Sequence, residues 1–265
     1  MERPNDEAPP EVHPTAIVHP KAELASGTRV APYAIVGDGV RVGRGTEIGA
    51  HVVLEGLVEI GERCRIFPGA VIGTPPQDLK YVEGIRSGVR IGDGNVIREY
   101  ATIHRSSLEE GWTEIGHGNF LMAASHIAHD CKIGNGVIIT NYAGLTGFVE
   151  VEDRAVISGL TGIHQFTRIG ALAYVGGCSK VVQDVPPYLI ADGNPAQARG
   201  VNVVGLRRAN IPAEVRQDLQ RAFKILYRSG LSTPHALERI RAELPPSEQI
   251  AHLVGFIAAS KRGIC

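Results

Sequence analysis

Aliphatic residues recur at every sixth position along most of this chain. Counting from Val12, each sixth residue through Ile72 is valine, leucine or isoleucine, and the count resumes at Ile91 and again at Ile115. The full set is Val12, Val18, Leu24, Val30, Val36, Val42, Ile48, Leu54, Ile60, Ile66, Ile72, Ile91, Ile97, Ile103, Ile115, Leu121, Ile127, Ile133, Ile139, Leu145, Val151, Ile157, Ile163, Ile169, Val175 and Val181. Glycine often follows directly, and a small residue usually stands four places after the aliphatic one.

A six-residue period fits neither a helix, which repeats every 3.6 residues, nor a single strand, which alternates every two. It fits a short strand followed by a turn, with the aliphatic side chain pointing into a prism-shaped core. Three such sides make a coil of 18 residues, and coils stack at the ~4.8 Å spacing of paired strands. The pattern therefore predicts a mainly β fold, a parallel β-helix of hexapeptide repeats.

Two segments interrupt the count, near residues 73–90 and 104–114. Insertions into a solenoid form loops, and such loops often carry binding groups. The first insertion contains the polar run Gln77-Asp78-Leu79-Lys80. We expect both insertions to be loops on the β-helix.

From about Pro212 the apolar spacing becomes helical. One helix is expected up to Gly230, a second is expected to begin at Thr233-Pro234, and a third near Ser247. We therefore predict two domains, a β-helix over residues 1–190 and a C-terminal helical domain over residues 191–265. The helical domain would cap the open end of the solenoid, whose last strands are otherwise exposed edges.

Composition narrows the function. The chain has 27 Lys and Arg against 28 Asp and Glu, a net charge of −1, which argues against a surface built for nucleic acid. No apolar run reaches the ~18 residues of a membrane span, and the polar N-terminus lacks a secretory signal. The four cysteines form no CxxC pair. We expect a soluble, cytoplasmic protein with no nucleic-acid partner and no stable membrane insertion.

The charge is unevenly distributed. Residues 186–265 carry 11 basic and 6 acidic side chains, a net of +5, whereas the rest of the chain carries 16 and 22, a net of −6. A basic cap on an acidic body indicates a docking surface for an acidic partner. An ordinary solvated helical face has the same charge, so both interpretations stay open on charge alone.

Stacking the chain at 18-residue intervals places candidate chemistry in columns. His129, Gly147 and Gln165 form one column, His126, Gly144 and Gly162 a second, and Ala123, Asn141, Gly159 and Gly177 a third. Missing side chains leave a groove with accessible backbone N–H groups beside an imidazole. In this interpretation His129 is a general base, Asp130 helps to orient it, and the Gly147 N–H stabilises an oxyanion. The absence of a nucleophile elbow favours direct transfer over a covalent acyl-enzyme.

Two other interpretations remain at this point. His117, His126, His129 and His164 could supply imidazoles to zinc across a subunit boundary, as in the gamma-class carbonic anhydrases of the same fold. Such a hydratase would need neither the long basic cap nor the Gln77–Lys80 loop. A non-catalytic scaffold is the other alternative.

Several short stretches carry a more specific signal. They are Gln77–Tyr81 (QDLKY), Thr102–Arg105 (TIHR), His126–Cys131 (HIAHDC), Ile163–Phe166 (IHQF), Val175–Cys178 (VGGC), Gln183–Tyr188 (QDVPPY) and Gly200–Asn202 (GVN). In their order and spacing they resemble the bacterial acyl-[acyl-carrier-protein]–UDP-N-acetylglucosamine O-acyltransferase family of lipid A synthesis. The resemblance runs from about Val12 to the C-terminus.

The resemblance implies a left-handed coil and a homotrimer with active sites between neighbouring subunits. It implies that a 3-hydroxyacyl chain moves from the phosphopantetheine of acyl carrier protein to the glucosamine 3-hydroxyl of a UDP-sugar, with no metal and no further cofactor. The acidic carrier protein would then be the partner of the basic cap.

The resemblance also assigns residues to roles. His129 matches the general base, Asp130 the carboxylate that orients it, and Gly147 the backbone donor to the thioester oxygen. The remaining matches are Gln77, Asp78 and Lys80 with the sugar and phosphate, His126, His164 and Gln165 with further substrate contacts, Asn202 and Arg208 with the nucleotide, and Gly177 with the position that gauges acyl length.

The chain departs from the family pattern at three positions. Phe148 stands where histidine is frequent, Val204 replaces a glutamate near the nucleotide, and Ala209 follows Arg208 where a second arginine is common. Each change removes a polar contact, worth about 1–3 kcal/mol where it was buried and satisfied. A variant that acylates a 3-amino sugar to form an amide therefore remains an alternative.

Overall fold

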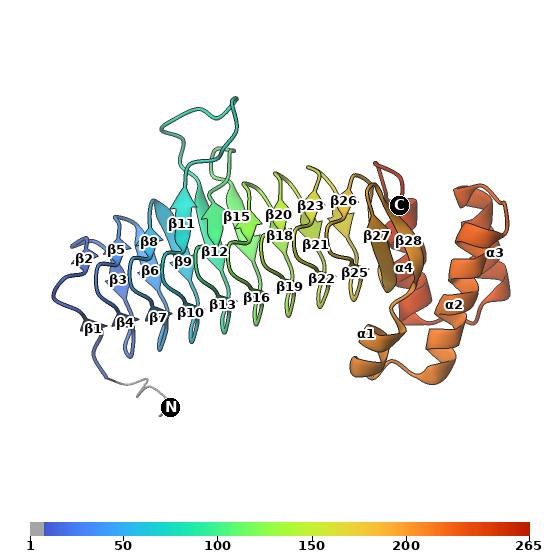
Figure 1. The fold of residues 1–265 in the computed structure, drawn as a ribbon, viewed down its shortest axis with the longest axis horizontal. Helices are drawn as coiled ribbons and strands as arrows, with labels where there is room; N and C mark the ends of the chain where they lie inside the picture. The colour runs from blue at the N-terminus through green and yellow to red at the C-terminus, as the bar shows by residue number, and fades with distance from the viewer. Residues whose placement is uncertain (1–7) are drawn as a thin grey trace.

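The hexapeptide repeat folds as a three-sided, left-handed parallel β-helix with helices at its C-terminal end (Figure 1). This arrangement is seen in a computed structural model, which describes residues 8–265. Each aliphatic residue of the six-residue count ends a short strand or lies within one, and from Val30 onward its side chain is buried. Ile97, Ile103 and Leu121 are fully buried examples from successive sides and coils. The predicted fold is confirmed.

Three sheets form the sides of the prism. Sheet A contains β1 (Glu11–Val12), β4 (Arg29–Val30), β7 (Glu47–Ile48), β10 (Arg65–Ile66), β13 (Val96–Ile97), β16 (Phe120–Leu121), β19 (Ile138–Ile139), β22 (Val156–Ile157), β25 (Tyr174–Val175), β27 (Leu189–Gly193) and β28 (Ala196–Val201). Sheet B contains β2 (Ile17–Val18), β5 (Ile35–Val36), β8 (Val53–Leu54), β11 (Val71–Thr74), β14 (Thr102–His104), β17 (His126–Ile127), β20 (Gly144–Leu145), β23 (Gly162–Ile163) and β26 (Lys180–Val181). Sheet C contains β3 (Glu23–Leu24), β6 (Val40–Val42), β9 (Leu57–Ile60), β12 (Gly88–Ile91), β15 (Trp112–Ile115), β18 (Lys132–Ile133), β21 (Glu150–Val151) and β24 (Arg168–Ile169).

The two predicted insertions leave the solenoid at the same corner. One runs from β11 to β12 and the other from β14 to β15, so both connect sheet B to sheet C. Because β14 pairs directly with β11 and with β17, the two loops lie on neighbouring coils, next to the coil that carries His129. They project from the otherwise regular solenoid in Figure 1.

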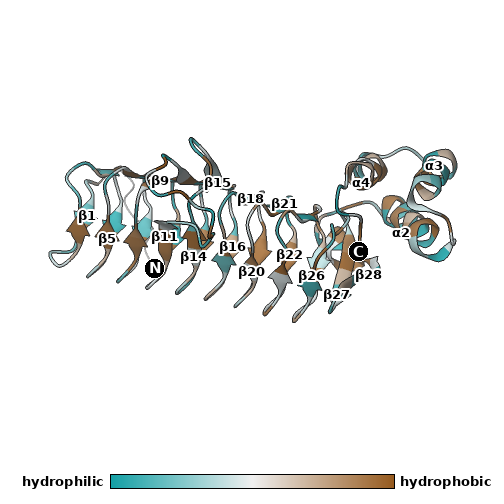
Figure 2. Cartoon of the chain, turned by 90° about the horizontal axis from the view of Figure 1, so that it is seen from above, coloured by the Kyte–Doolittle hydropathy of each residue, from teal (hydrophilic) through white to brown (hydrophobic). Residues whose placement is uncertain are grey.

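The C-terminal end changes from parallel strands to helices. β27 pairs with β25 in parallel and with β28 as an antiparallel hairpin, so sheet A continues past residue 190. The helices are α1 (Val203–Arg208), α2 (Ala213–Arg228), α3 (Thr233–Glu243) and α4 (Glu248–Ala258). Figure 2 shows α2, α3 and α4 grouped beyond β28. The domain division at residue 190 stays a prediction.

The helices have a core of their own. Leu219, Phe223, Ile240 and Leu253 are buried together with Leu189 of β27. Thr233 opens α3, but the N-cap position belongs to Ser232. Helix α1 was not predicted from the sequence, since its six residues carry no apolar stripe. Among the described residues no helix combines the length and apolarity of a membrane span.

Candidate active site

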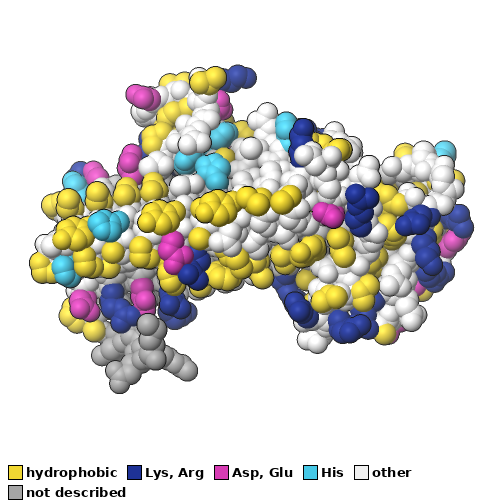
Figure 3. Space-filling model, in the orientation of Figure 1, with side chains coloured by type: hydrophobic (Ala, Val, Ile, Leu, Met, Phe, Trp, Pro, Cys, Tyr) yellow, Lys and Arg dark blue, Asp and Glu magenta, His cyan; other side chains and the backbone are white. Residues whose placement is uncertain are grey.

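His129 lies at the corner between sheets B and C, two residues after β17. Its coil follows directly on the coil that carries the second loop, and only 7% of its surface is exposed. Histidine side chains gather on the surface below the projecting loops (Figure 3). The site therefore lies at one corner of the solenoid, beside the inserted loops.

Asp130 holds the His129 ring from one side. The His129 Nδ1 and Asp130 Oδ2 atoms are 2.7 Å apart. Neighbouring residues usually face apart, but Asp130 has a left-handed backbone (φ 61°) at this corner, so its carboxylate returns to the ring of the preceding residue. The contact predicted from adjacency in the chain is present.

Two serines of the second loop hold the other side of the Asp130 carboxylate. The Ser106 hydroxyl donates to Oδ1, and Ser107 donates to Oδ2 through its N–H at 3.0 Å and its hydroxyl at 2.6 Å. Burial acts to raise the pKa of Asp130, but the hydrogen bonds from His129, Ser106 and Ser107 together lower it below its usual value. Asp130 is thus a carboxylate, so His129 donates from Nδ1 and keeps Nε2 as a proton acceptor.

The free Nε2 of His129 faces a second carboxylate and a glycine. Asp78 of the first loop places Oδ2 3.9 Å from Nε2. A Cβ atom on Gly147 would lie 2.5 Å from His129 Cε1 and 2.6 Å from Nε2. Only glycine therefore leaves room for the ring in its present position. The Gly147 N–H makes no backbone hydrogen bond within residues 8–265 and is available to a ligand.

The predicted column of His126, Gly144 and Gly162 is present in the register of sheet B. Thr102, His126, Gly144, Gly162 and Lys180 are successive partners on the outer face of sheet B. A Cβ atom at Gly144 or Gly162 would meet no heavy atom within 4 Å. The two glycines therefore open a bare strip beside His126.

His104, at the end of β14, belongs to the same cluster although it was not assigned a role from the sequence. Its ring lies edge-on to that of His126 at 4.9 Å, and His126 Nδ1 is 2.7 Å from the Thr102 hydroxyl. Burial, followed by the neighbouring His126 and His129, lowers the pKa of His104 to about 4. Burial and then His129 also lower the pKa of His126. Both rings are therefore neutral at pH 7.

The remaining predicted residues are more dispersed. Gln77 and Lys80 are exposed on the first loop beside Asp78, and the Lys80 N–H donates to Asp78 Oδ1 at 2.9 Å. His164 and Gln165 are exposed two coils beyond His129. Gly177 lies at the corner between sheets A and B, and a Cβ atom there would be in ordinary contact with the Gly159 carbonyl at 3.4 Å.

The two predicted nucleotide contacts lie at the helical end, and within residues 8–265 neither contacts His129. Asn202 caps α1, where its Oδ1 accepts from the Gly205 N–H and its Nδ2 donates to the Leu172 carbonyl. Arg208 is exposed at the end of the same helix. Their assignment to the nucleotide stays a prediction.

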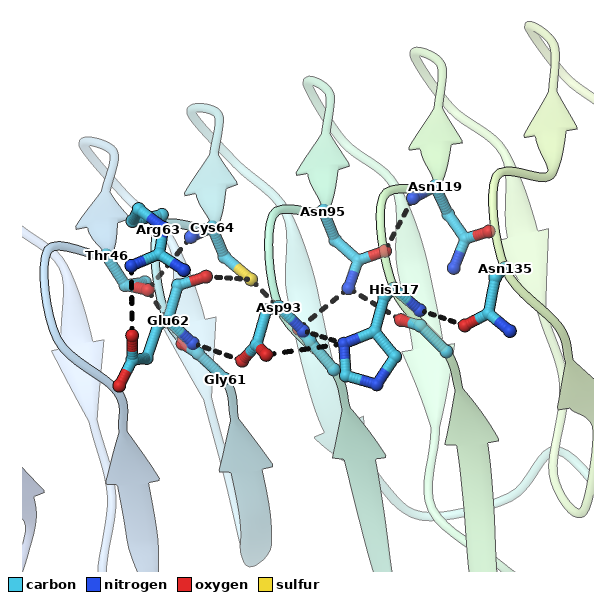
Figure 4. Close-up of polar contacts among 12 residues, drawn as sticks. Thr46, Gly61, Glu62, Arg63, Cys64, Asp93, Asn95, His117, Asn119 and Asn135 are labelled. Carbon is cyan, nitrogen blue, oxygen red and sulfur yellow. Dashed lines mark hydrogen bonds and ion pairs between the residues drawn. The ribbon is translucent and has the colours of Figure 1, made fainter.

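His117 belongs to a different corner, between sheets C and A. There Asp93, His117 and Asn135 each accept a hydrogen bond from a backbone N–H of the coil before, at 2.8, 2.9 and 2.8 Å (Figure 4). The histidine thus replaces a carboxylate or amide in a structural ladder. Within the described chain no group of three or more histidine, cysteine or acidic side chains has an arrangement that could hold a metal.

Phe148 gives the site an apolar side. Its ring meets His129 edge-on at 5.4 Å and stacks on Phe166 at 4.8 Å. Phe148, at the position where the family often has histidine, therefore supports the His129 ring by packing against it. Ser106 and Ser107 were missed because loop residues have no period, although the TIHR stretch, which contains His104, lies directly before them.

Comparisons with known proteins give matches along most of the chain. A family model of bacterial transferase hexapeptides (six repeats) matches residues 113–147, and one for domain 2 of UDP N-acetylglucosamine O-acyltransferase matches residues 184–265. The acyl-[acyl-carrier-protein]–UDP-N-acetylglucosamine O-acyltransferase of Thermodesulfovibrio yellowstonii is 54% identical over 256 residues, 96% of this chain and 99% of the relative. Its namesake from Verminephrobacter eiseniae is 44% identical over 259 residues, 96% and 98% of the two chains.

Solved structures show the same likeness. The UDP-N-acetylglucosamine acyltransferase from Bacteroides fragilis 9343 has a TM-score of 0.91 and 37% identity, over 96% of this chain and 99% of that chain. Fold and site define a hexapeptide-repeat acyltransferase. The chain belongs to the acyl-[acyl-carrier-protein]–UDP-N-acetylglucosamine O-acyltransferase family, and the resemblance drawn from the sequence is confirmed.

Proposed function

We propose that this chain transfers a 3-hydroxyacyl group from acyl carrier protein to the glucosamine 3-hydroxyl of UDP-N-acetylglucosamine, the first step of lipid A synthesis. The observation that carries the proposal is the pairing of His129 with Asp130 at 2.7 Å, which leaves Nε2 free beside Gly147. Family membership supports both substrates.

The reaction needs one proton acceptor and one oxyanion donor. His129 Nε2 removes the proton from the sugar 3-hydroxyl as its oxygen forms a bond to the thioester carbonyl carbon. The Gly147 N–H stabilises the charge on the carbonyl oxygen, and Asp130 stabilises the imidazolium. When the carbon–sulfur bond breaks, the thiolate of the phosphopantetheine takes the proton from His129. No cofactor beyond that arm is required.

The surrounding residues fit the two substrates. Asp78, 3.9 Å from His129 Nε2, is placed to contact the sugar near the reacting hydroxyl, with Gln77 and Lys80 beside it. The bare strip at Gly144 and Gly162 suits an acyl chain next to His126. Gly177, with only ordinary contacts at its Cβ position, is the proposed gauge of acyl length.

We further propose a homotrimer. Tyr33, Tyr100, Tyr142 and Leu160 occupy the corner between sheets A and B, each 58–69% exposed with a left-handed backbone. A row of hydrophobic side chains runs along the solenoid in Figure 3. Exposed apolar rows of this kind mark protein interfaces, and a second copy of the chain is the proposed occupant. Each subunit would then supply Asn202, Arg208, His164 or Gln165 to the active site of its neighbour.

The helical end suits the acidic carrier protein. Arg221, Lys224 and Arg228 of α2 are exposed, and basic side chains gather over the helices in Figure 3. Complementary charge raises the rate of encounter and fixes orientation, and both effects weaken as salt rises.

A transfer assay tests the proposal. Purified protein is mixed with 3-hydroxyacyl carrier proteins of several lengths and with UDP-N-acetylglucosamine or its 3-amino analogue, with and without a chelator. We expect chelator-insensitive ester product on the first sugar. Product on the 3-amino sugar alone would assign Phe148, Val204 and Ala209 to an amide-forming enzyme. Loss of transfer with chelator would indicate a metal, and no product from either sugar would refute the proposed function.

A further inference from the structure

We propose that Arg105, Ser106 and Ser107 form a positioning segment that sets both carboxylates beside His129. The segment begins directly after β14 and opens the second loop. Ser106 and Ser107 act on Asp130, and Arg105 acts on Asp78 through the first loop. The inference rests on the proposed function for the roles of the two carboxylates, whereas the contacts themselves are independent of it.

The serine half of the segment fixes Asp130. Three hydrogen bonds from Ser106 and Ser107 reach its two oxygens, and Ser106 is fully buried. The Ser106 hydroxyl oxygen also accepts from the Leu108 N–H at 3.0 Å, which ties the start of the loop to itself. The loop therefore fixes the orientation of the Asp130 carboxylate independently of the His129 ring.

The arginine half holds the first loop at two points. Arg105 Nη1 donates to the Gly73 carbonyl at 3.4 Å, where that loop begins. Its Nε and Nη2 atoms donate to the Tyr81 hydroxyl at 3.3 and 3.2 Å, eight residues further on. A Cβ atom on Gly56 would lie 2.7 Å from Arg105 Nη1, so this glycine makes room for the guanidinium. One side chain thus closes residues 73–81 into a ring.

Asp78 lies inside that ring. Its Oδ1 accepts from the Lys80 N–H at 2.9 Å, which turns Oδ2 toward His129. Leu79 and Val82 are exposed, so the loop has little apolar packing of its own. Among the described residues, Tyr81 makes the hydrogen bonds from residues 75–82 to the solenoid. Losing the Tyr81 hydroxyl should therefore free Asp78 and leave Asp130 in place.

Two substitutions separate the two halves. Tyr81→Phe keeps the ring but removes the acceptor for Arg105, and Ser107→Ala removes one donor to Asp130. Hydrogen bonds to charged groups are among the stronger ones, so we expect about 5- to 20-fold effects. Tyr81→Phe should raise KM for UDP-N-acetylglucosamine with kcat changed less, because Asp78 faces the sugar. Ser107→Ala should lower kcat with KM nearly unchanged, and Ser107→Thr should restore it.

A second measurement is independent of activity. Lys80 is exposed, so trypsin cleavage after Lys80 reports how firmly the loop is held. Tyr81→Phe and Arg105→Lys should both speed cleavage several-fold, and adding Tyr81→Phe to Arg105→Lys should change little, because Arg105→Lys already removes the contact with the Tyr81 hydroxyl. Ser107→Ala should cleave at the wild-type rate. Tyr174→Phe, which loses a hydroxyl on the outer face of sheet A, is the control that should change neither cleavage nor kinetics.

The outcomes are distinct. Equal cleavage of Tyr81→Phe and wild type, or an unchanged KM, would overturn the arginine half. A Ser107→Ala enzyme with normal kcat, or one that Ser107→Thr fails to rescue, would overturn the serine half. A wild-type protein that transfers no acyl chain would refute the proposed function, and the cleavage rates would still decide whether Arg105 holds the loop.

Discussion

Sheets B and C have similar aliphatic residues on their inner faces but different residues on their outer faces. Ile127 and Leu145 of sheet B and Ile133 and Val151 of sheet C all point inward and are buried. On the outer face of sheet C, acidic and basic residues alternate from coil to coil. This charge ladder is Glu23, Arg41, Glu59, Arg90, Glu114, Lys132, Glu150 and Arg168. On sheet B the matching positions past β14 are His126, Gly144, Gly162 and Lys180.

The difference separates the residues that make the coil from those that make the site. In the charge ladder most rungs form ion pairs with a neighbouring rung, such as Arg90 at 2.9 Å from Glu59 and 3.6 Å from Glu114. That face is therefore filled with charged side chains. The sheet B face lacks side chains at two rungs, Gly144 and Gly162, so it leaves a bare strip that leads toward His129 and the Gly147 N–H. The same interior supports an inert face and a reactive one.

The largest difference is expected between two histidines, one at the active site and one at the corner beside sheet C. His129→Ala should lower kcat on the order of 10²–10⁴-fold, because it removes the general base. His117→Ala, on the corner beside sheet C, should leave kcat within about two-fold, since its ring accepts a backbone hydrogen bond far from the groove. Steady-state transfer rates test both variants. Near-normal turnover by His129→Ala would rule out its role as the base.

Two glycines make the next contrast. Gly147→Ala places a Cβ atom 2.5 Å from the His129 ring, and we expect kcat to fall about 10- to 100-fold as the base is displaced. Gly134→Ala places a Cβ atom 2.4 Å from Asp153 Oδ1 in the structural ladder. It should reduce the free energy of unfolding by about 1–3 kcal/mol with little change in kcat. Denaturant unfolding and kcat together separate them; a Gly147→Ala enzyme with full activity would contradict the proposed packing.

The periodic parts of this site could be predicted from sequence, and the aperiodic parts could not. A fixed interval of 18 residues places His126 beneath Gly144 and Gly162, and the structure has them as sheet partners. Asp130 required one further fact, its left-handed backbone at the corner, before its carboxylate could be placed against His129.

The loops have no interval to count. Asp78 faces His129 because Arg105 holds the Tyr81 hydroxyl, a contact between residues 24 positions apart on two insertions. Ser106 and Ser107 bind Asp130 in the same way, through loop conformation. Composition also gave no indication that Asn202 caps α1 with its Oδ1 while its Nδ2 donates to the Leu172 carbonyl. Side-chain contacts of this kind depend on tertiary structure.

The stability of the protein at low pH tests the burial of the histidines beside sheet B. Since the pKa of His104 is lowered to about 4, the unfolded chain binds a proton below pH ~6.5 that the folded chain does not. The free energy of unfolding should therefore have its full value above pH ~6.5 and decrease as the pH drops toward 4. His104→Gln should flatten this decline, measured as Tm at pH 8 and pH 5. An equal decline in variant and wild type would contradict the burial of a neutral ring.

The charge ladder should give the smallest effect. Glu59→Lys turns the contacts with Arg41 and Arg90 from attraction to repulsion, but all three side chains are 31–61% exposed. Exposed pairs contribute little, so we expect a loss of about 1 kcal/mol in the free energy of unfolding and an unchanged kcat. The loss should shrink in high salt, which screens exposed charges. Glu59→Gln, which removes the charge without reversing it, should lose less. A fall in kcat would mean that the sheet C face contributes to the reaction.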